Sequence, residues 1–324
     1  MNSNDARKST AWGWGAALLM VLIGSGWQLA TRAGARAELA PVDLALLRYV
    51  IPALLLAPVW LRTGLVPARV GRRRLALIVA GAGLPFGLLA MGGASLAPVA
   101  HMGALLPGAS PILVMLLTWL WWGTRPGRAQ VAGLGLVGIG LALATFPSWS
   151  GTLGSSWLGD LLFIGAATLW ALYTLALRNA GLSPWQSAAL VSIWSALGVA
   201  PLWCLAFAGG ISLVPSASGA QLLAQAVWQG LVAGVAGLAV YGFAVKHIGP
   251  AATSSVGALV PAVVAIGGWV LLGEALDALA WLGVLAVVAG VWLASRAGAA
   301  GSAAVLSGCD AAMRIEQPKR PYSA

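Results

Sequence analysis

Charged residues are scarce in this sequence. Only 8% of its 324 residues are Asp, Glu, Lys or Arg, whereas soluble domains carry roughly 25%. So few charges cannot cover a water-facing surface of this size, which excludes a soluble enzyme and a disordered chain. Because 60% of the residues are apolar and mean hydropathy is +0.90, the composition predicts a multi-pass integral membrane protein.

Cysteine and histidine are nearly absent as well. Cys204 and Cys309 are the only cysteines, which excludes a disulfide framework. The two histidines, His101 and His247, have no neighbours with metal-ligand spacing, so we predict no metal site, no cofactor and no catalytic residue. No Asp or Glu lies deep in an apolar run, so a proton-driven mechanism has no obvious carboxylate.

Long apolar runs fill most of the chain. A helix needs about 20 apolar residues to cross the hydrocarbon core. Ten runs reach this length, and they predict an all-α integral membrane protein with ten transmembrane helices. The predicted spans are 12–31, 42–61, 75–95, 98–121, 129–147, 158–178, 186–207, 225–244, 251–272 and 279–296.

Basic residues mark one side of the predicted bundle. If the N-terminus is cytoplasmic, all but three of the 18 Lys and Arg fall in cytoplasmic segments. Arg32 and Arg36 lie outside, and Arg48 lies within the second span. This bias predicts a protein of the cytoplasmic (inner) membrane with both termini cytoplasmic. The net charge of +10 is therefore explained by basic residues on the cytoplasmic side, and we expect no nucleic acid partner.

The chain contains an internal repeat. Pro111 and Gly123 enclose an apolar segment of the same length as that between Pro261 and Gly273, and a glycine-rich span follows each. Five spans per repeat is an odd number, so the second repeat enters the membrane from the opposite side, as in many secondary transporters. We therefore predict two inverted five-helix repeats around a central cavity. The expected organisation is a cytoplasmic segment 1–11, repeats 12–147 and 157–296, and a flexible cytoplasmic tail 297–324.

The second repeat carries short motifs in a recognisable order. They are Gly159-Asp160, Trp170-Ala171, Gly249-Pro250, Pro261 and Leu271-Leu272-Gly273-Glu274. With them the chain resembles the EamA family of the drug/metabolite transporter (DMT) superfamily. The resemblance implies ten helices, a central cavity and transport of small metabolites. The first repeat has Thr124 where the family usually has the Glu that Glu274 matches. For Glu274 itself we expect a role in capping a helix or orienting a loop.

Arg48 is the most informative single residue. A cation about 10 Å inside a span is costly unless it pairs, snorkels or faces a wet cavity. One interpretation is an anchor for an anionic substrate group such as a carboxylate. The alternatives are pairing with Asp43 or Glu38, and snorkelling to the interface.

Other candidates are polar or aromatic residues within spans. Trp27-Gln28 and Tyr173-Thr174 occupy equivalent repeat positions, which meet near mid-membrane in an inverted repeat. His101 lies in a proline-rich span and could line the path or titrate. Helix packing and interfacial placement stay open as alternatives. The predicted substrate-binding residues are Trp27, Gln28, Arg48, Tyr49, His101, Trp170, Tyr173, Tyr241 and Ser254.

These features predict a secondary transporter. It would move small organic metabolites, such as amino acids or related compounds, across the cytoplasmic membrane by alternating access. The alternative is a non-transporting scaffold or regulatory relative with the same fold. The expected partners are the substrate and the lipid bilayer. The sequence leaves open the substrate, the direction of transport, coupling to a proton or another ion, and a homodimer.

Overall fold

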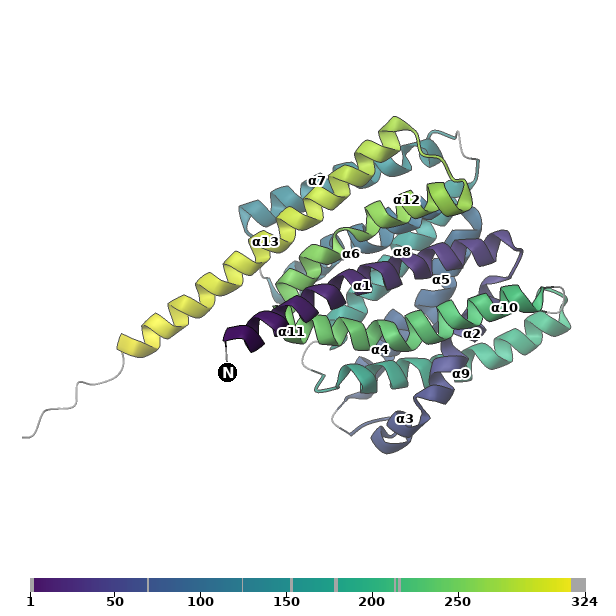
Figure 1. The fold of residues 1–324 in the computed structure, drawn as a ribbon, viewed down its shortest axis with the longest axis horizontal. Helices are drawn as coiled ribbons and strands as arrows, with labels where there is room; N and C mark the ends of the chain where they lie inside the picture. Colours follow the sequence, from purple (N-terminus) through teal and green to yellow (C-terminus); the bar gives the residue numbers. More distant parts are fainter. Residues whose placement is uncertain are drawn as a thin grey trace, which may run out of the picture.

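The computed structural model describes residues 3–68, 70–123, 125–151, 154–177, 180–212, 214 and 217–315. Within these ranges, the structure describes only the backbone of residues 3–10, 122, 238, 245, 246, 249–251, 254 and 297–315. Within the described part the chain is helical and has no strand (Figure 1). The predicted all-α class is therefore confirmed.

The helices follow one another with short connections. The first repeat holds α1 (Ser3–Arg36), α2 (Pro41–Leu55), α3 (Ala57–Thr63), α4 (Arg72–Ala82), α5 (Leu84–Leu96), α6 (Val99–Trp122) and α7 (Arg128–Trp149). The second holds α8 (Ser156–Leu177), α9 (Pro184–Ala208), α10 (Gly219–Gln225), the π-helix η2 (Ala226–Ala236), α11 (Gly237–Gly257), α12 (Val260–Leu272) and α13 (Ala278–Ile315).

Nine of the described helices are long and apolar enough to cross a membrane, and the bent pair α2–α3 makes a tenth. The predicted second span, 42–61, is therefore not one straight helix: its two parts meet at an angle of 69°. Pro52 lies inside α2 and Pro58 in the first turn of α3, so the backbone cannot continue unbroken between them. Helix α13 runs past residue 296 to Ile315, and residues 316–324 lie outside the described part.

The bundle has two ends, which we name by their residues. The "Glu274 end" holds the end of α1, the starts of α6 and α8, and the loop after α12 that contains Glu274. The "Arg72 end" is opposite and holds the start of α4. Because successive spans alternate in direction, every connection between two spans lies at one of these two ends.

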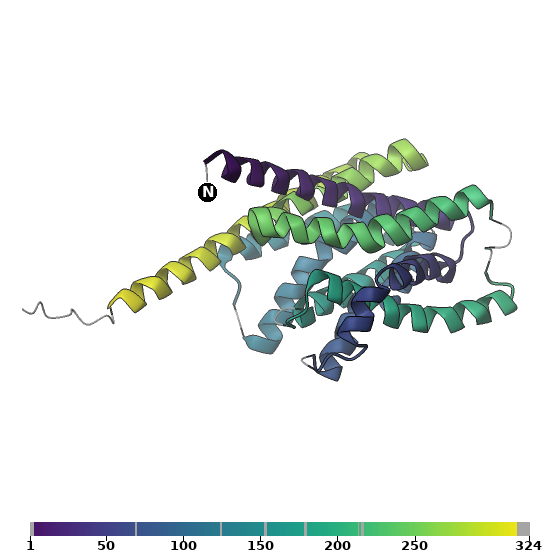
Figure 2. The ribbon, with the colours of Figure 1, turned by 60° about the horizontal axis from the view of Figure 1, so that its bottom comes forward.

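The first helix of each repeat packs against the other repeat. Helix α1 contacts η2, α11 and α12, whereas α8 contacts α4, α5 and α6 (Figures 1 and 2). Helices α2 and α9 contact each other, as do α7 and α13. This reciprocal arrangement is the packing expected of two inverted five-helix repeats, so neither repeat buries its apolar faces alone.

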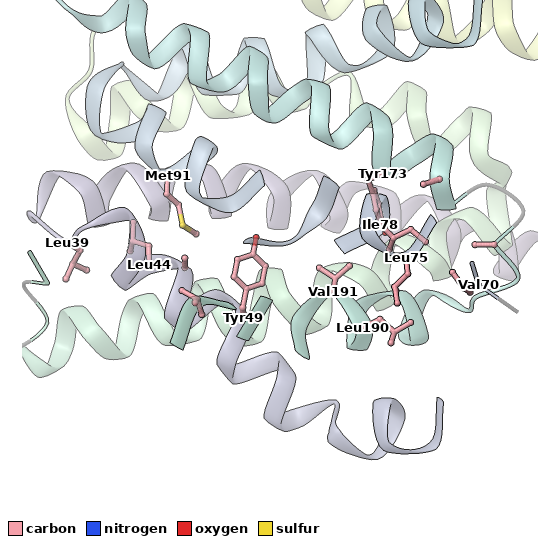
Figure 3. Close-up of a cluster of buried hydrophobic side chains, with 14 residues drawn as sticks. Leu39, Leu44, Tyr49, Val70, Leu75, Ile78, Met91, Tyr173, Leu190 and Val191 are labelled. Carbon is pink, nitrogen blue, oxygen red and sulfur yellow. The ribbon is translucent and has the colours of Figure 1, made fainter. Parts of the chain in front are cut away.

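A break between α4 and α5 illustrates how the membrane interior constrains the backbone. At Gly83 the helix is interrupted, and its polar groups need partners because no lipid atom can supply one. The Tyr49 hydroxyl donates to the Gly83 carbonyl at 2.6 Å, and the Leu84 amide donates to Ser195 Oγ at 2.9 Å. Figure 3 shows Tyr49 and Tyr173 in one buried cluster built from both repeats.

Reciprocal glycines hold α7 against α13. A Cβ atom added at Gly140 would lie 2.7 Å from the Gly283 carbonyl oxygen, and one added at Gly283 would lie 2.7 Å from the Gly140 carbonyl oxygen. Gly133 and Gly290 face each other in the same way. Gly138, on the same helix, has open space where its Cβ would be. The two backbones therefore touch along one face of α7 only.

This contact predicts opposite outcomes for two alanine substitutions. Gly140→Ala places a methyl group against α13 backbone atoms, so the helices must separate, and we expect the protein to lose about 1–3 kcal/mol of stability. Gly138→Ala should leave the melting temperature unchanged or raise it, because alanine favours the helix. Thermal unfolding of both variants in the same nanodiscs checks this. Equal losses from the two substitutions would contradict the packing.

Candidate functional site

Four aromatic rings from both repeats form a continuous row, which we call the "aromatic row". Trp27 of α1 stacks on Phe86 of α5, with ring centroids 6.0 Å apart. Phe86 lies 5.4 Å from Trp170 of α8, and Trp170 lies 5.1 Å from Tyr173. The structure thus brings together three predicted site residues through Phe86, which the sequence analysis missed. Phe86 lies in an apolar run without a motif, so nothing in the sequence distinguishes it from a core residue.

Arg48 of α2 extends one end of this row. Its guanidinium carbon lies 4.4 Å from the centroid of the Trp27 ring and 5.9 Å from that of Tyr49. Its Nε and Nη1 atoms are buried and have no hydrogen-bond partner. Stacking on an aromatic face stabilises a cation but leaves the in-plane N–H donors free. Arg48 therefore presents donors that a carboxylate or another planar anion could accept.

Asp43, one of the two carboxylates expected as alternative partners of Arg48, has other hydrogen bonds. Oδ1 of Asp43 accepts from the Trp203 indole at 2.8 Å and from the Ser212 hydroxyl at 2.6 Å. Its Oδ2 accepts from the Ala40 amide at 3.1 Å. These contacts tie the start of α2 to α9 and to the segment after it.

A buried amide network positions Trp27. The indole N–H donates to Gln229 Oε1 at 2.8 Å, and Gln229 Nε2 donates to Thr31 Oγ1 at 3.1 Å and to Gln225 Oε1 at 3.2 Å. Gln225 Nε2 in turn donates to the Ala30 carbonyl at 2.8 Å. We call Trp27, Thr31, Gln225 and Gln229 the "glutamine network". It joins α1 to the π-helix η2, and π-helical turns frequently occur at functional sites.

The sequence analysis missed Gln229, although a signal was available. Gln229 is fully buried, and an amide within an apolar run needs a partner, the same reasoning that singled out Gln28. Gln28 is also buried, and its Oε1 has no partner. Ser25, one turn earlier on α1, likewise has an unpartnered buried hydroxyl. Helix α1 therefore carries polar atoms that the described protein groups do not satisfy.

Other predicted site residues lie apart from Arg48 or have a different setting. The Tyr49 hydroxyl is engaged at the α4–α5 break. His101 is buried at the Glu274 end beside Asp160 of α8, with 2.8 Å between Nδ1 and Oδ1. Tyr241 of α11 is 48% exposed. The side chain of Ser254 lies outside the described residues.

Glu274 joins several helices at the Glu274 end. Its Oε2 accepts from the Val99 amide at 2.7 Å, at the start of α6, and its Oε1 accepts from Arg32 Nε at 2.6 Å. Arg32 also donates to the Ala94 carbonyl at 2.6 Å, and Arg36 donates to the Leu272 carbonyl. The expected capping role of Glu274 is therefore confirmed, and the contacts join α1, α5, α6 and α12.

A surface hollow lies elsewhere in the molecule. It has a volume of about 380 Å³ and is open to the outside between the loop after α3 and the start of α9. Its lining residues are Arg62, Thr63, Pro67, Ala68 and Gln186. None of the predicted site residues lines it.

Two inverted five-helix repeats, each inserting its first helix into the other, define the class of helical membrane proteins to which many secondary transporters belong. The sequence model of the EamA-like transporter family matches residues 11–146 and 157–296, so the chain belongs to that family, as its motifs indicated. Members of this family are transporters within the drug/metabolite transporter superfamily.

Known structures support the fold. A chain titled "Crystal structure of protein" is similar with a TM-score of 0.56 and 20% sequence identity, over 89% of this chain and 97% of that one. At this identity the likeness concerns the fold alone. None of the curated proteins compared with the chain matches it.

A double substitution tests whether Trp27 and Gln229 are coupled through the glutamine network. Trp27→Phe removes the indole N–H but keeps a ring beneath Arg48, and Gln229→Leu removes the amide. We expect each to destabilise the protein, because each leaves buried polar groups unpaired. The double variant should lose less than the two losses combined, with a coupling of about 1 kcal/mol. Thermal unfolding of the four proteins measures it, and strictly additive losses would contradict the network.

Proposed function

We propose that the protein is a secondary transporter whose substrate is a small organic molecule bearing a carboxylate, such as an amino acid or a related metabolite. The single observation that carries this proposal is the guanidinium of Arg48. It is held over Trp27 within a span, with two buried nitrogen atoms that have no partner. A substrate carboxylate would accept from those donors, and charge-assisted bonds of this kind are among the strongest in proteins.

The aromatic row supports a substrate that has an apolar organic part besides its carboxylate. Rings beside a charged anchor bind the apolar part of an organic molecule, and they contact it without losing much conformational entropy. Trp27 and Phe86 come from the first repeat, Trp170 and Tyr173 from the second. A substrate placed along this row would touch both repeats, as alternating access requires of a central site.

The distribution of charge supports an orientation. Among the described residues, Arg72, Arg73 and Arg74 lie at the Arg72 end, whereas Arg32 and Arg36 at the Glu274 end both contact groups at the α12–α13 connection. By the positive-inside rule, the Arg72 end faces the cytoplasm. In this orientation both termini are cytoplasmic, and the protein resides in the cytoplasmic membrane. Export is the direction that we favour, by analogy within the family alone.

A ligand screen with matched pairs tests the anchor. The purified protein in nanodiscs is unfolded thermally with amino acids and other metabolite carboxylates, and with their amides. We expect carboxylates to raise the melting temperature and their amides to leave it unchanged, because only an anion complements Arg48. Arg48→Gln should weaken carboxylate binding by about 10–100-fold, the equivalent of a lost charged hydrogen bond.

Arg296→Gln is the matched control for the screen. Arg296 also stacks on an indole, 3.9 Å from the Trp292 ring centroid, but it lies at the Arg72 end, outside the proposed site. It should retain wild-type binding. Undiminished binding by Arg48→Gln would refute the anchor. Flux of a bound carboxylate into proteoliposomes then separates a transporter from a scaffold, because a scaffold would bind without flux.

A further inference from the structure

A second polar cluster lies at the Glu274 end, away from the aromatic row. His101 of α6 and Asp160 of α8 are in contact, with side chains 3% and 1% exposed. The Ser148 hydroxyl of α7 lies 3.3 Å from His101 Nδ1 and 2.8 Å from the Ser156 hydroxyl. Oδ2 of Asp160 is buried and has no hydrogen-bond partner. The proposed substrate site uses none of Ser148, Ser156 and Asp160.

The charge of this cluster depends on a single proton. With a neutral imidazole and an ionised carboxylate, the pair buries one negative charge without compensation, which is costly in a water-excluded site. One added proton makes the pair neutral overall, either as imidazolium and carboxylate or as imidazole and carboxylic acid. The unpartnered Oδ2 atom is an acceptor that the surrounding protein leaves available.

Charged groups on the neighbouring helices do not remove this dependence. Glu274 lies nearby, because it accepts from the Val99 amide two residues before His101, but Arg32 and Arg36 pair with it. Asp277 accepts from the Ala280 amide at the start of α13. Helices α5 and α12 contain no ionisable side chain, and the described basic residues of α4, α7 and α13 lie at the Arg72 end.

The pair also joins the two repeats. Helix α6 belongs to the first repeat and α8 to the second, and they pack closely here. A Cβ atom at Gly159, next to Asp160, would lie 2.6 Å from the Ala97 side chain at the α5–α6 junction. An uncompensated charge at this contact would draw in water and weaken it, whereas the neutral pair can stay dry.

We propose that His101 and Asp160 form a proton-binding site, and that the proton-bound form stabilises the contact between the repeats at the Glu274 end. Such a site would give the transporter a proton-dependent step without a carboxylate deep in a span. Proton binding itself does not rest on the proposed substrate, since it can be measured with no substrate present.

Selective labelling of histidine gives a direct readout, because the chain has only two. In the ¹⁵N-histidine protein in nanodiscs, His247→Gln assigns the two NMR signals. We expect the His101 imidazole signals to shift as the pH rises from about 5 to about 9, and to titrate differently in Asp160→Asn. A His101 signal that shows no titration over this range, or that titrates identically in Asp160→Asn, would overturn the proposal.

Thermal unfolding over the same pH range tests the stabilising role. Because the proposal makes the proton-bound form the stabilising one, it predicts a stabilisation that is present at low pH and lost as the pH rises. We expect the wild-type melting temperature to fall by at least about 2 °C more than that of Asp160→Asn. His247→Gln, which alters the other histidine, should keep the wild-type dependence. Parallel pH profiles of wild type and Asp160→Asn would overturn this role. If Asp160→Asn fails to fold, His101→Gln takes its place.

Discussion

The hydrogen bond between Trp27 and Gln229 is the contact on which the proposed site depends. It joins the first helix of one repeat to the π-helix of the other, and it fixes the indole ring on which Arg48 rests. In hydrocarbon neither group has a solvent partner, so separation of the two helices leaves both unsatisfied. The same constraint explains the bonds at the Gly83 break and the bond between Gln225 of α10 and Gln229 of η2. At the Gly83 break and at η2, polar groups on neighbouring helices therefore accommodate the departure from regular helix geometry.

The two ends of the bundle are not equivalent. Glu274 joins the starts and ends of several helices through Arg32, Val99 and Arg36, and the His101–Asp160 pair lies at the same end. Thr124, the repeat equivalent of Glu274, has no carboxylate and lies outside the described residues. The contacts at the Glu274 end thus depend on a carboxylate that the first repeat lacks at the equivalent position.

The sequence alone was sufficient for the spans, because apolar length is a strong signal. It did not reveal the bend after Leu55, the break at Gly83 or the π-helix η2, since these depend on partners from other helices. Arg48 and Trp27 stood out as costly or bulky residues within spans, and the structure places them in contact. Phe86 and Ser148 did not stand out, and Gln229 was overlooked although it is an amide within an apolar run. Their roles come from neighbours distant in sequence, and an inverted repeat brings such neighbours together without leaving a local motif.

The most direct test of the account is an experimental structure with the tightest-binding carboxylate bound. We predict that its oxygens lie within hydrogen-bond distance, about 2.7–3.2 Å, of Arg48 Nε and Nη1, with its apolar part against the aromatic row. A carboxylate bound in the surface hollow near Arg62 or beside His101, with the Arg48 nitrogens still unpartnered, would contradict the central claim that Arg48 anchors the substrate.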